Sequence, residues 1–185
     1  MEKTIQEISD FIKRYRSINN VDIIFTLGKY TECFGFEKNL FQKDNYSNIF
    51  DKLDSCTQWE KVNKTNYTKF NKEPVKIIDT IIFKSENSPY DFIINAVTSK
   101  KTEIYNSDDY TEDVISYKRK NHTFNLIKSE TPIVGVVYKL DIVLNLNLPK
   151  NYTDTYVSHS SLLKVMDMIS ACNEDKNEIL FTKIA

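Results

Sequence analysis

The strictest constraint on the fold comes from residues 134–148, where apolar and polar residues alternate with a period of two. Tyr138, Leu140, Ile142, Leu144, Leu146 and Leu148 share one face, opposite Lys139, Asp141, Val143, Asn145 and Asn147. Side chains alternate across a β-strand, so this period predicts a strand with one buried face and one wetter face. Such a strand requires a sheet with one apolar, buried face and one more polar face.

Further strands are predicted where β-branched and aromatic residues cluster between polar breaks. They fall at 21–27, 75–83, 91–97, 101–105, 114–118, 123–128 and 178–182. Gly28 is predicted to end the first of them. Apolar residues at spacings of three and four predict helices over 5–15, one or two short helices within 36–53, and a helix over 158–169.

This order of elements favours an α+β fold with antiparallel strands over a parallel α/β fold. The sequence predicts an antiparallel β-barrel or tunnel with flanking helices, whose lumen is polar. A sheet with one solvated face explains the same polar positions more simply. With 185 residues and neither a linker nor a repeat, the chain is expected to be a single domain, 1–185.

Composition narrows the location and the general class of partner. The net charge of −1 gives no overall field that would attract nucleic acid or an anionic membrane. Cys33, Cys56 and Cys172 are odd in number and scattered, which argues against a disulfide framework and a zinc site. The polar N-terminus lacks a signal-peptide core, and no run is long enough to cross a membrane. A cytoplasmic, reducing location is expected.

Common catalytic motifs do not occur. The chain lacks GxGxxG, a Walker loop, GxSxG and HExxH, and its two histidines, His122 and His159, are better interpreted as surface residues than as catalytic bases. The basic cluster Lys118-Arg119-Lys120 fits a solvated turn better than a phosphate site. Local motifs therefore name no reaction.

The order of segments carries more information. A helix leads into Val21-Asp-Ile-Ile-Phe-Thr-Leu-Gly28, strands follow, and the chain closes on Ser160-Ser-Leu-Leu163, a helix and Asn177-Glu-Ile-Leu-Phe-Thr182. This order resembles the metal-dependent RNA 5′-triphosphatases of the tunnel fold, the first enzymes of mRNA capping in fungi and large DNA viruses. In that family the first and last strands are neighbours and each carries Glu-x-Glu. Their four carboxylates hold a divalent metal against the γ-phosphate, and Arg and Lys side chains hold the phosphate oxygens.

Laid on this chain, the resemblance places the first pair on Asp22 and Ile24 and the second on Glu178 and Leu180, so each pair keeps one acid. It implies Asp22 and Glu178 as catalytic residues and ligands of Mg or Mn. It implies Lys139, Lys128 and Arg119 as phosphate contacts, because Asn125 stands where the family's arginine is expected.

Two functional hypotheses follow from the resemblance. The first is a divergent RNA 5′-triphosphatase-like domain of viral mRNA capping, with weakened or lost catalysis, partnered by an RNA 5′ end or by capping or virion proteins. Its location would be the host cytoplasm or the virion. The second is a non-catalytic protein-binding or virion structural component on the same or an unrelated α+β fold. Apolar residues in place of lumen acids suit a tunnel filled by its own side chains.

Overall fold

The computed structural model describes residues 2–15, 18, 21–56, 58–67, 70–71, 75–86, 89–99, 104–105, 111–119, 122–145, 162, 165–169 and 181–184. Its helices are α1 (Glu2–Tyr15), the short 3-10 helix η1 (Lys38–Leu40) and α2 (Lys43–Asp54), and residues 165–169 are also helical. The strands are β1 (Val21–Thr31), β2 (Gly35–Glu37), β3 (Glu60–Tyr67), β4 (Phe70–Asn71), β5 (Val75–Ser85), β6 (Asp91–Ser99), β7 (Ile104–Tyr105), β8 (Thr111–Arg119), β9 (His122–Thr131), β10 (Gly135–Asn145) and β11 (Phe181–Ile184).

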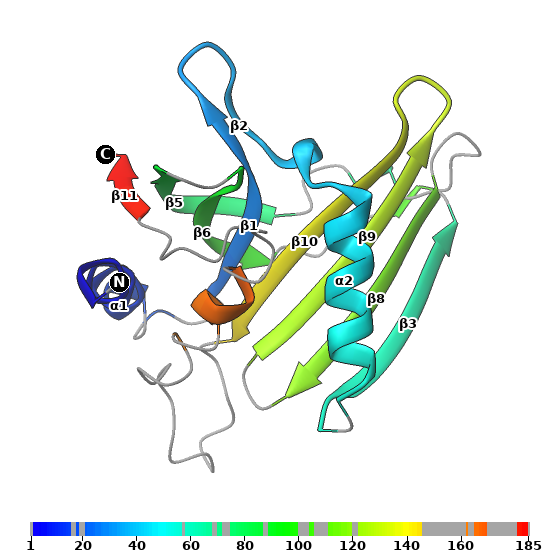
Figure 1. The fold of residues 1–185 in the computed structure, drawn as a ribbon, viewed down its shortest axis with the longest axis horizontal. Helices are drawn as coiled ribbons and strands as arrows, with labels where there is room; N and C mark the ends of the chain where they lie inside the picture. The colour runs from blue at the N-terminus through cyan, green and yellow to red at the C-terminus, as the bar shows by residue number, and fades with distance from the viewer. Residues whose placement is uncertain are drawn as a thin grey trace.

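One large antiparallel sheet dominates the fold (Figure 1). Its strand order is β11-β5-β6-β1-β10-β9-β8-β3, with β2 paired to β1, while β4 and β7 form a separate two-stranded sheet. The α+β class and the antiparallel pairing are confirmed. The closed barrel is wrong for the described residues, because β11 and β3 stand at opposite ends of the order and do not pair with each other.

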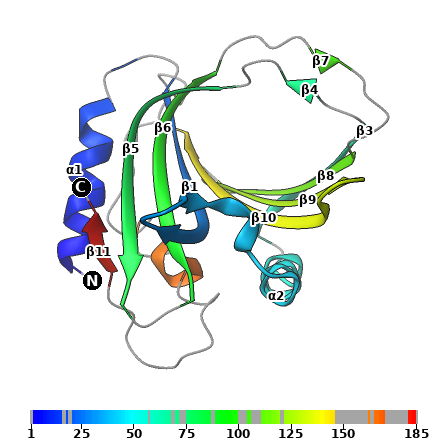
Figure 2. The same cartoon turned by 90° about the horizontal axis from the view of Figure 1, so that it is seen from above.

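The sheet is strongly curved, and its helices lie on the convex side. Figure 2 shows α1 beside β5 and α2 beneath β10, while the concave side faces β4 and β7. We call the helix-covered side the outer face and the concave side the inner face. An unclosed sheet with one helix-covered face gives the same alternation of apolar and polar residues as a barrel with a polar lumen, which explains why the sequence suggested a lumen.

The hydrophobic core lies between the outer face of the sheet and the helices. Val21, Ile23, Phe25 and Leu27 of β1 are fully buried there. They pack in one cluster with apolar residues of three helical segments, which are Ile5, Ile8, Phe11 and Ile12 of α1, Ile49 and Leu53 of α2, and Val165, Met166 and Ile169. Burial of an aliphatic or aromatic side chain of this size stabilises a fold by about 1.5–3 kcal/mol. This cluster therefore fixes which face of each strand points outward.

An aromatic group joins the strands at one end of the outer face. The ring of Phe92 on β6 stacks on Phe83 at 4.9 Å and on Phe25 at 6.1 Å, and it meets Phe181 edge-on at 4.9 Å. These rings come from β5, β1 and β11, so one side chain contacts three other strands. Phe181 is thereby tied into the core at the edge of the sheet.

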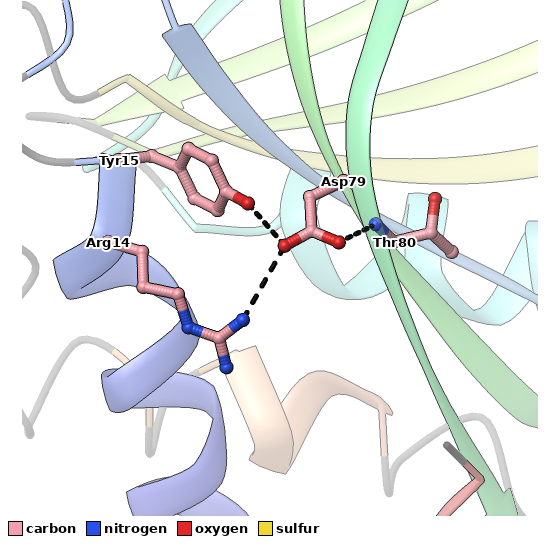
Figure 3. Close-up of polar contacts among 4 residues, drawn as sticks. All are labelled: Arg14, Tyr15, Asp79 and Thr80. Carbon is pink, nitrogen blue, oxygen red and sulfur yellow. Dashed lines mark hydrogen bonds and ion pairs between the residues drawn. The ribbon is translucent and has the colours of Figure 1, made fainter.

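Helix α1 is attached to β5 by a polar contact beside this core (Figure 3). The Tyr15 hydroxyl donates a hydrogen bond to the Asp79 carboxylate, and the Arg14 guanidinium lies 3.6 Å from the same oxygen. The β5–β6 register shifts between Ile77 and Asp79, as it does at a β-bulge. The other carboxylate oxygen of Asp79 accepts from the backbone N–H of Thr80 at 2.8 Å. The β-bulge thus turns a carboxylate outward, where α1 ends.

Several element boundaries differ from the sequence prediction. Gly28 does not end β1, which continues to Thr31 and pairs with β2. Helix α2 begins at Lys43, so its first turn is made of polar residues that give no apolar spacing to predict it. Strand β3 was not predicted, because its sequence Glu-Lys-Val-Asn-Lys-Thr-Asn-Tyr has almost no apolar alternation. Its backbone nevertheless pairs with β8 from Glu60 to Tyr67.

The prediction that the first and last strands are neighbours in the sheet is also wrong. The described part of the last strand, β11, pairs with β5, and both β5 and β6 lie between it and β1. The two sides of β1 are occupied by β6 and β10. Among the described helices, none has the length and apolar character needed to cross a membrane.

Gly28 offers a test of how β2 is held. A Cβ at this position would lie 2.2 Å from the Glu37 carbonyl oxygen and 2.8 Å from the Phe36 ring. We predict that Gly28→Ala lowers the free energy of unfolding by about 1–3 kcal/mol, because β2 must move away from β1. The measurement is equilibrium urea denaturation of both proteins.

The control is Gly135→Asn, since Gly135 has φ +78° and no neighbour within 4 Å of a Cβ. Asn tolerates that backbone conformation, so a loss below about 1 kcal/mol is expected. Equal losses in the two variants would contradict the close approach of β2 to Gly28.

Candidate functional site

The candidate site lies on the inner face, where strand alternation places the residues between the core positions. On β1 these are Asp22, Ile24 and Thr26. The antiparallel register sets Ile24 opposite Val143 and Thr26 opposite Asp141 of β10. Neighbouring strands therefore contribute one polar pair and one apolar pair at successive levels of the same face.

A row of polar side chains crosses the sheet at the level of Thr26. The Thr26 hydroxyl donates a 2.7 Å hydrogen bond to Oδ1 of Asp141. Asp141 is directly opposite Asn125 of β9, and Ser116 of β8 donates to Oδ1 of Asn125 at 2.6 Å. Four adjacent strands thus supply a polar row from Thr26 to Ser116. Thr26 itself is only 1% exposed, so this row is partly removed from water.

Asp141 has the most perturbed environment in this row. Burial raises the pKa of its carboxyl, and the negative charge of Glu112 raises it further. The Thr26 hydrogen bond and the positive charges of Lys38 and Lys139 lower the pKa. Desolvation disfavours the charged form of a carboxyl, and here it outweighs the two cations. The site therefore holds an acid that retains its proton more readily than a surface aspartate does.

Asp22 stands apart from this row. Burial also raises the pKa of its carboxyl, and no cation or hydrogen bond is among the causes of the shift. Its register partner, Asn145, is four residues from Asp141 along β10. Four residues of a strand span about 13 Å, so the two carboxylates are far apart. Ile24 and Val143 lie between them.

The described residues do not fit the divalent metal that the resemblance implies. Ligand oxygens sit about 2.0–2.6 Å from Mg²⁺ or Ca²⁺, and therefore no more than about 5 Å from one another. Asp22 and Asp141 cannot meet that limit. Within the described part of the chain, no group of three or more His, Cys, Asp and Glu residues is placed to hold a metal ion.

The structure separates the three predicted phosphate contacts. Lys139 lies on the inner face, where its charge acts on Asp141. Lys128 is paired with Tyr138, whose ring packs on Tyr46 of α2 at 4.9 Å, which places Lys128 on the outer face. Arg119 is opposite His122 in the β8–β9 register, and strand alternation places it on the outer face as well. Its guanidinium donates a 2.6 Å hydrogen bond to Gln58. Only Lys139 shares a face with Asp22.

Even Lys139 is remote from Asp22 along the sheet. It is six residues from Asn145 on β10, a span of about 20 Å. Glu178 and Leu180 lie outside the described residues. The predicted site residues that the structure describes therefore do not converge on one point.

Sequence reasoning passed over Thr26 and Asp141, which make a direct hydrogen bond on the inner face. The signal was present in the alternation, since Thr26 follows Asp22 and Ile24 at the same period and Asp141 belongs to the polar face of residues 139–147. Their pairing depends on the β1–β10 register, which no local pattern specifies.

Asp141 gives a pH-dependent prediction. Because burial raises its folded pKa above the ordinary value, the folded protein binds this proton more tightly than the unfolded chain does. Its contribution to stability is therefore present at low pH and is lost as pH rises through the raised pKa. We predict that Asp141→Asn, whose amide oxygen still accepts from Thr26, is more stable than wild type at about pH 8 and loses that advantage near about pH 4.

Urea denaturation at both pH values measures the difference. Ser116→Ala is the control, because it removes a hydrogen bond from the same row without touching a carboxylate. Its cost, about 1 kcal/mol, should not change with pH. An Asp141→Asn effect that is the same at both pH values would refute the assignment of a raised pKa to this group.

Comparisons with known proteins support the fold and leave the activity open. No family model matches the chain, and no curated protein matches its sequence. Among solved structures, the RNA triphosphatase Pct1 of S. pombe matches with a TM-score of 0.70 at 10% identity, covering 94% of this chain and 93% of that one. The structure of Pct1 in complex with the Spt5 CTD matches with a TM-score of 0.63 at 11% identity, covering 94% of both chains. The chain is thus similar in fold to an RNA triphosphatase.

Proposed function

We propose that this chain is a divergent RNA 5′-triphosphatase-like domain that has lost metal-dependent hydrolysis and acts as a binding component. The observation that carries the proposal is the apolar pair Ile24 and Val143, which lies between the carboxylates of Asp22 and Asp141 on the inner face. Hydrolysis of a triphosphate by a divalent metal needs several oxygen ligands at one point. Here two branched apolar side chains occupy the position between the remaining acids.

The burial of the inner face supports the same proposal. Ile93, Asn95 and Val97 of β6 and Thr26 of β1 are all less than 10% exposed. Asn95 already accepts a 2.6 Å hydrogen bond from Thr80, and Asp141 accepts from Thr26. A triphosphate entering this region would lose its hydration against apolar groups and satisfied polar groups. That desolvation opposes the binding of a triphosphate in this region.

The setting that we propose is an mRNA-capping apparatus of a large DNA virus, in the host cytoplasm or the virion. Support comes from the order of segments in the sequence and from the likeness in fold to the RNA triphosphatase Pct1. The likeness to a Pct1 complex with the Spt5 CTD supports a protein partner, since that triphosphatase binds a protein segment. Other capping or virion proteins are thus favoured partners, ahead of an RNA 5′ end.

A competing proposal keeps catalysis, with Asp22 and Glu178 as ligands of Mg or Mn and Lys139 as a phosphate contact. The shared inner face of Asp22 and Lys139 favours it. Against it stand the span of about 20 Å between their positions along the sheet and the pairing of β11 with β5 rather than β1. The two proposals predict opposite results for phosphate release. The non-catalytic protein releases no phosphate, whereas the hydrolase releases it with Mg²⁺ or Mn²⁺.

We predict that purified protein releases no phosphate from 5′-triphosphate RNA or from a nucleoside triphosphate with Mg²⁺ or Mn²⁺. The reason is that Asp22 and Asp141 lie about 13 Å apart along the sheet, and that no group of three or more His, Cys, Asp and Glu residues among the described ones is placed to hold a metal ion. The measurement is release of labelled γ-phosphate, compared with an Asp22→Ala, Glu178→Ala double variant as the background. Wild-type activity should equal that background.

A gain-of-function variant sharpens the test. Ile24→Glu with Leu180→Glu restores the Glu-x-Glu period of the family at both positions, and Ile24→Gln with Leu180→Gln is the matched uncharged control. Metal-induced thermal stabilisation in the glutamate variant alone would support a lost ligand set. Wild-type turnover that the double alanine variant abolishes would overturn the non-catalytic proposal and favour the hydrolase.

A further inference from the structure

Strand β5 bends where its register with β6 shifts. Between Ile77 and Asp79 two steps along β5 match one step along β6, and such a bulge bends the strand that carries it. Figure 2 shows the end of β5 that begins at Val75 curving toward β4 and β7, over the concave side of the sheet. The chain before β5 and the chain after β6 pair again there, with Phe70 opposite Tyr105. The bulge therefore marks where β5 turns over the inner face.

The hydrophobic core covers β5 on only one side of this bulge. Ile81 and Phe83, which follow the bulge, are 3% and 0% exposed, whereas Ile77 and Ile78 are 53% and 37% exposed. Segments with few buried apolar contacts open at a lower free energy than core strands do. The part of β5 before Asp79 is therefore held by its backbone ladder with β6 and by what is attached at the bulge.

The attachment at the bulge is the contact between Asp79 and the end of α1 (Figure 3). The Asp79 carboxylate accepts a hydrogen bond from the Tyr15 hydroxyl and lies 3.6 Å from the Arg14 guanidinium. The Tyr15 ring packs on the buried Phe11 at 5.4 Å, so the core fixes the position of the hydroxyl. We call Arg14, Tyr15 and Asp79 the clamp. It joins a helix that the core holds to the point where β5 bends.

Two properties of the clamp suit a contact that opens and closes. Arg14 is largely exposed and Asp79 is partly exposed, so water can replace either partner when the contact breaks. The clamp is also not needed to hold all of α1, because the Thr4 hydroxyl at the other end of the helix donates to the Phe181 carbonyl oxygen at 3.2 Å. Opening of the clamp can thus free the bulge while α1 stays packed on the core.

We propose that the clamp controls access to the inner face by setting how far the Val75 end of β5 curves over it. With the clamp closed, the bulge is held against α1 and the curved end of β5 keeps its place. With the clamp open, this end loosens while the core-covered part of β5 stays in the sheet, and inner-face residues become more accessible. The clamp acts in this way whether the inner face binds a partner or hydrolyses a phosphate, so its test is independent of the proposed function.

Hydrogen exchange, measured by NMR on the full chain, tests the movement. Tyr15→Phe removes one hydrogen bond from the clamp without changing β5, and the amides of residues 75–77 that bond to β6 should exchange about fivefold faster. Asp79→Ala removes both contacts with α1 and should raise the rate by about tenfold or more. Residues 81–83 should keep their wild-type rates in both variants. Thr4→Val is the matched control, because it removes the hydrogen bond at the other end of α1 and should leave residues 75–77 unchanged.

Chemical labelling tests access to the inner face. In a Val143→Cys background, a maleimide modifies the new thiol, and mass spectrometry of the peptide that contains residue 143 separates it from the natural cysteines. The labelling rate should rise about fivefold with Tyr15→Phe and stay unchanged with Thr4→Val. Equal effects of these two variants, or no faster exchange in Tyr15→Phe, would overturn the proposal. Faster exchange without faster labelling would also overturn it, since the clamp would then hold β5 without controlling access.

Discussion

The fold depends on the burial of one face of β1 beneath the helical segments. Ile23, Phe25 and Leu27 are completely buried in the outer core, and the strand lies between β6 and β10 near the middle of the sheet. A slip of one residue in register would exchange the two faces, moving the core residues inward and Ile24 outward. The hydrophobic core therefore fixes not only the strand but also which residues of β1 form the inner face.

Because the core lies on the outer face, the fold does not depend on the chemistry of the inner-face side chains. A β-branched residue such as Ile24 or Val143 suits a strand at least as well as a carboxylate does, and it needs no partner. Loss of an inner-face acid thus leaves the outer core unchanged. The likeness in fold to the RNA triphosphatase Pct1 at 10% identity is consistent with this separation, because the same sheet can be kept while inner residues diverge.

The sequence predicted those elements whose evidence is local. Alternation located β10 and spacing located α1, because each pattern records burial within one element. Strand β3 escaped prediction because it is held by backbone pairing to β8 at the sheet edge, and pairing leaves no mark on composition. The same limit applies to the inner face. Alternation set Asp22 and Ile24 on one face, whereas the Thr26–Asp141 contact depends on a register between strands 115 residues apart.

The strands that frame the inner face extend beyond it into two hairpin turns. Strand β1 holds Thr26 in its middle and leads into the β1–β2 turn, while β10 starts after the β9–β10 turn and reaches Asp141. The β1–β10 ladder, which runs from the Asp22–Asn145 pair to the Thr26–Asp141 pair, is what brings Thr26 to Asp141. A sheet kept for binding would preserve this ladder without requiring any metal ligand. The proposed binding role thus gives a physical reason for this fold to persist without a metal site.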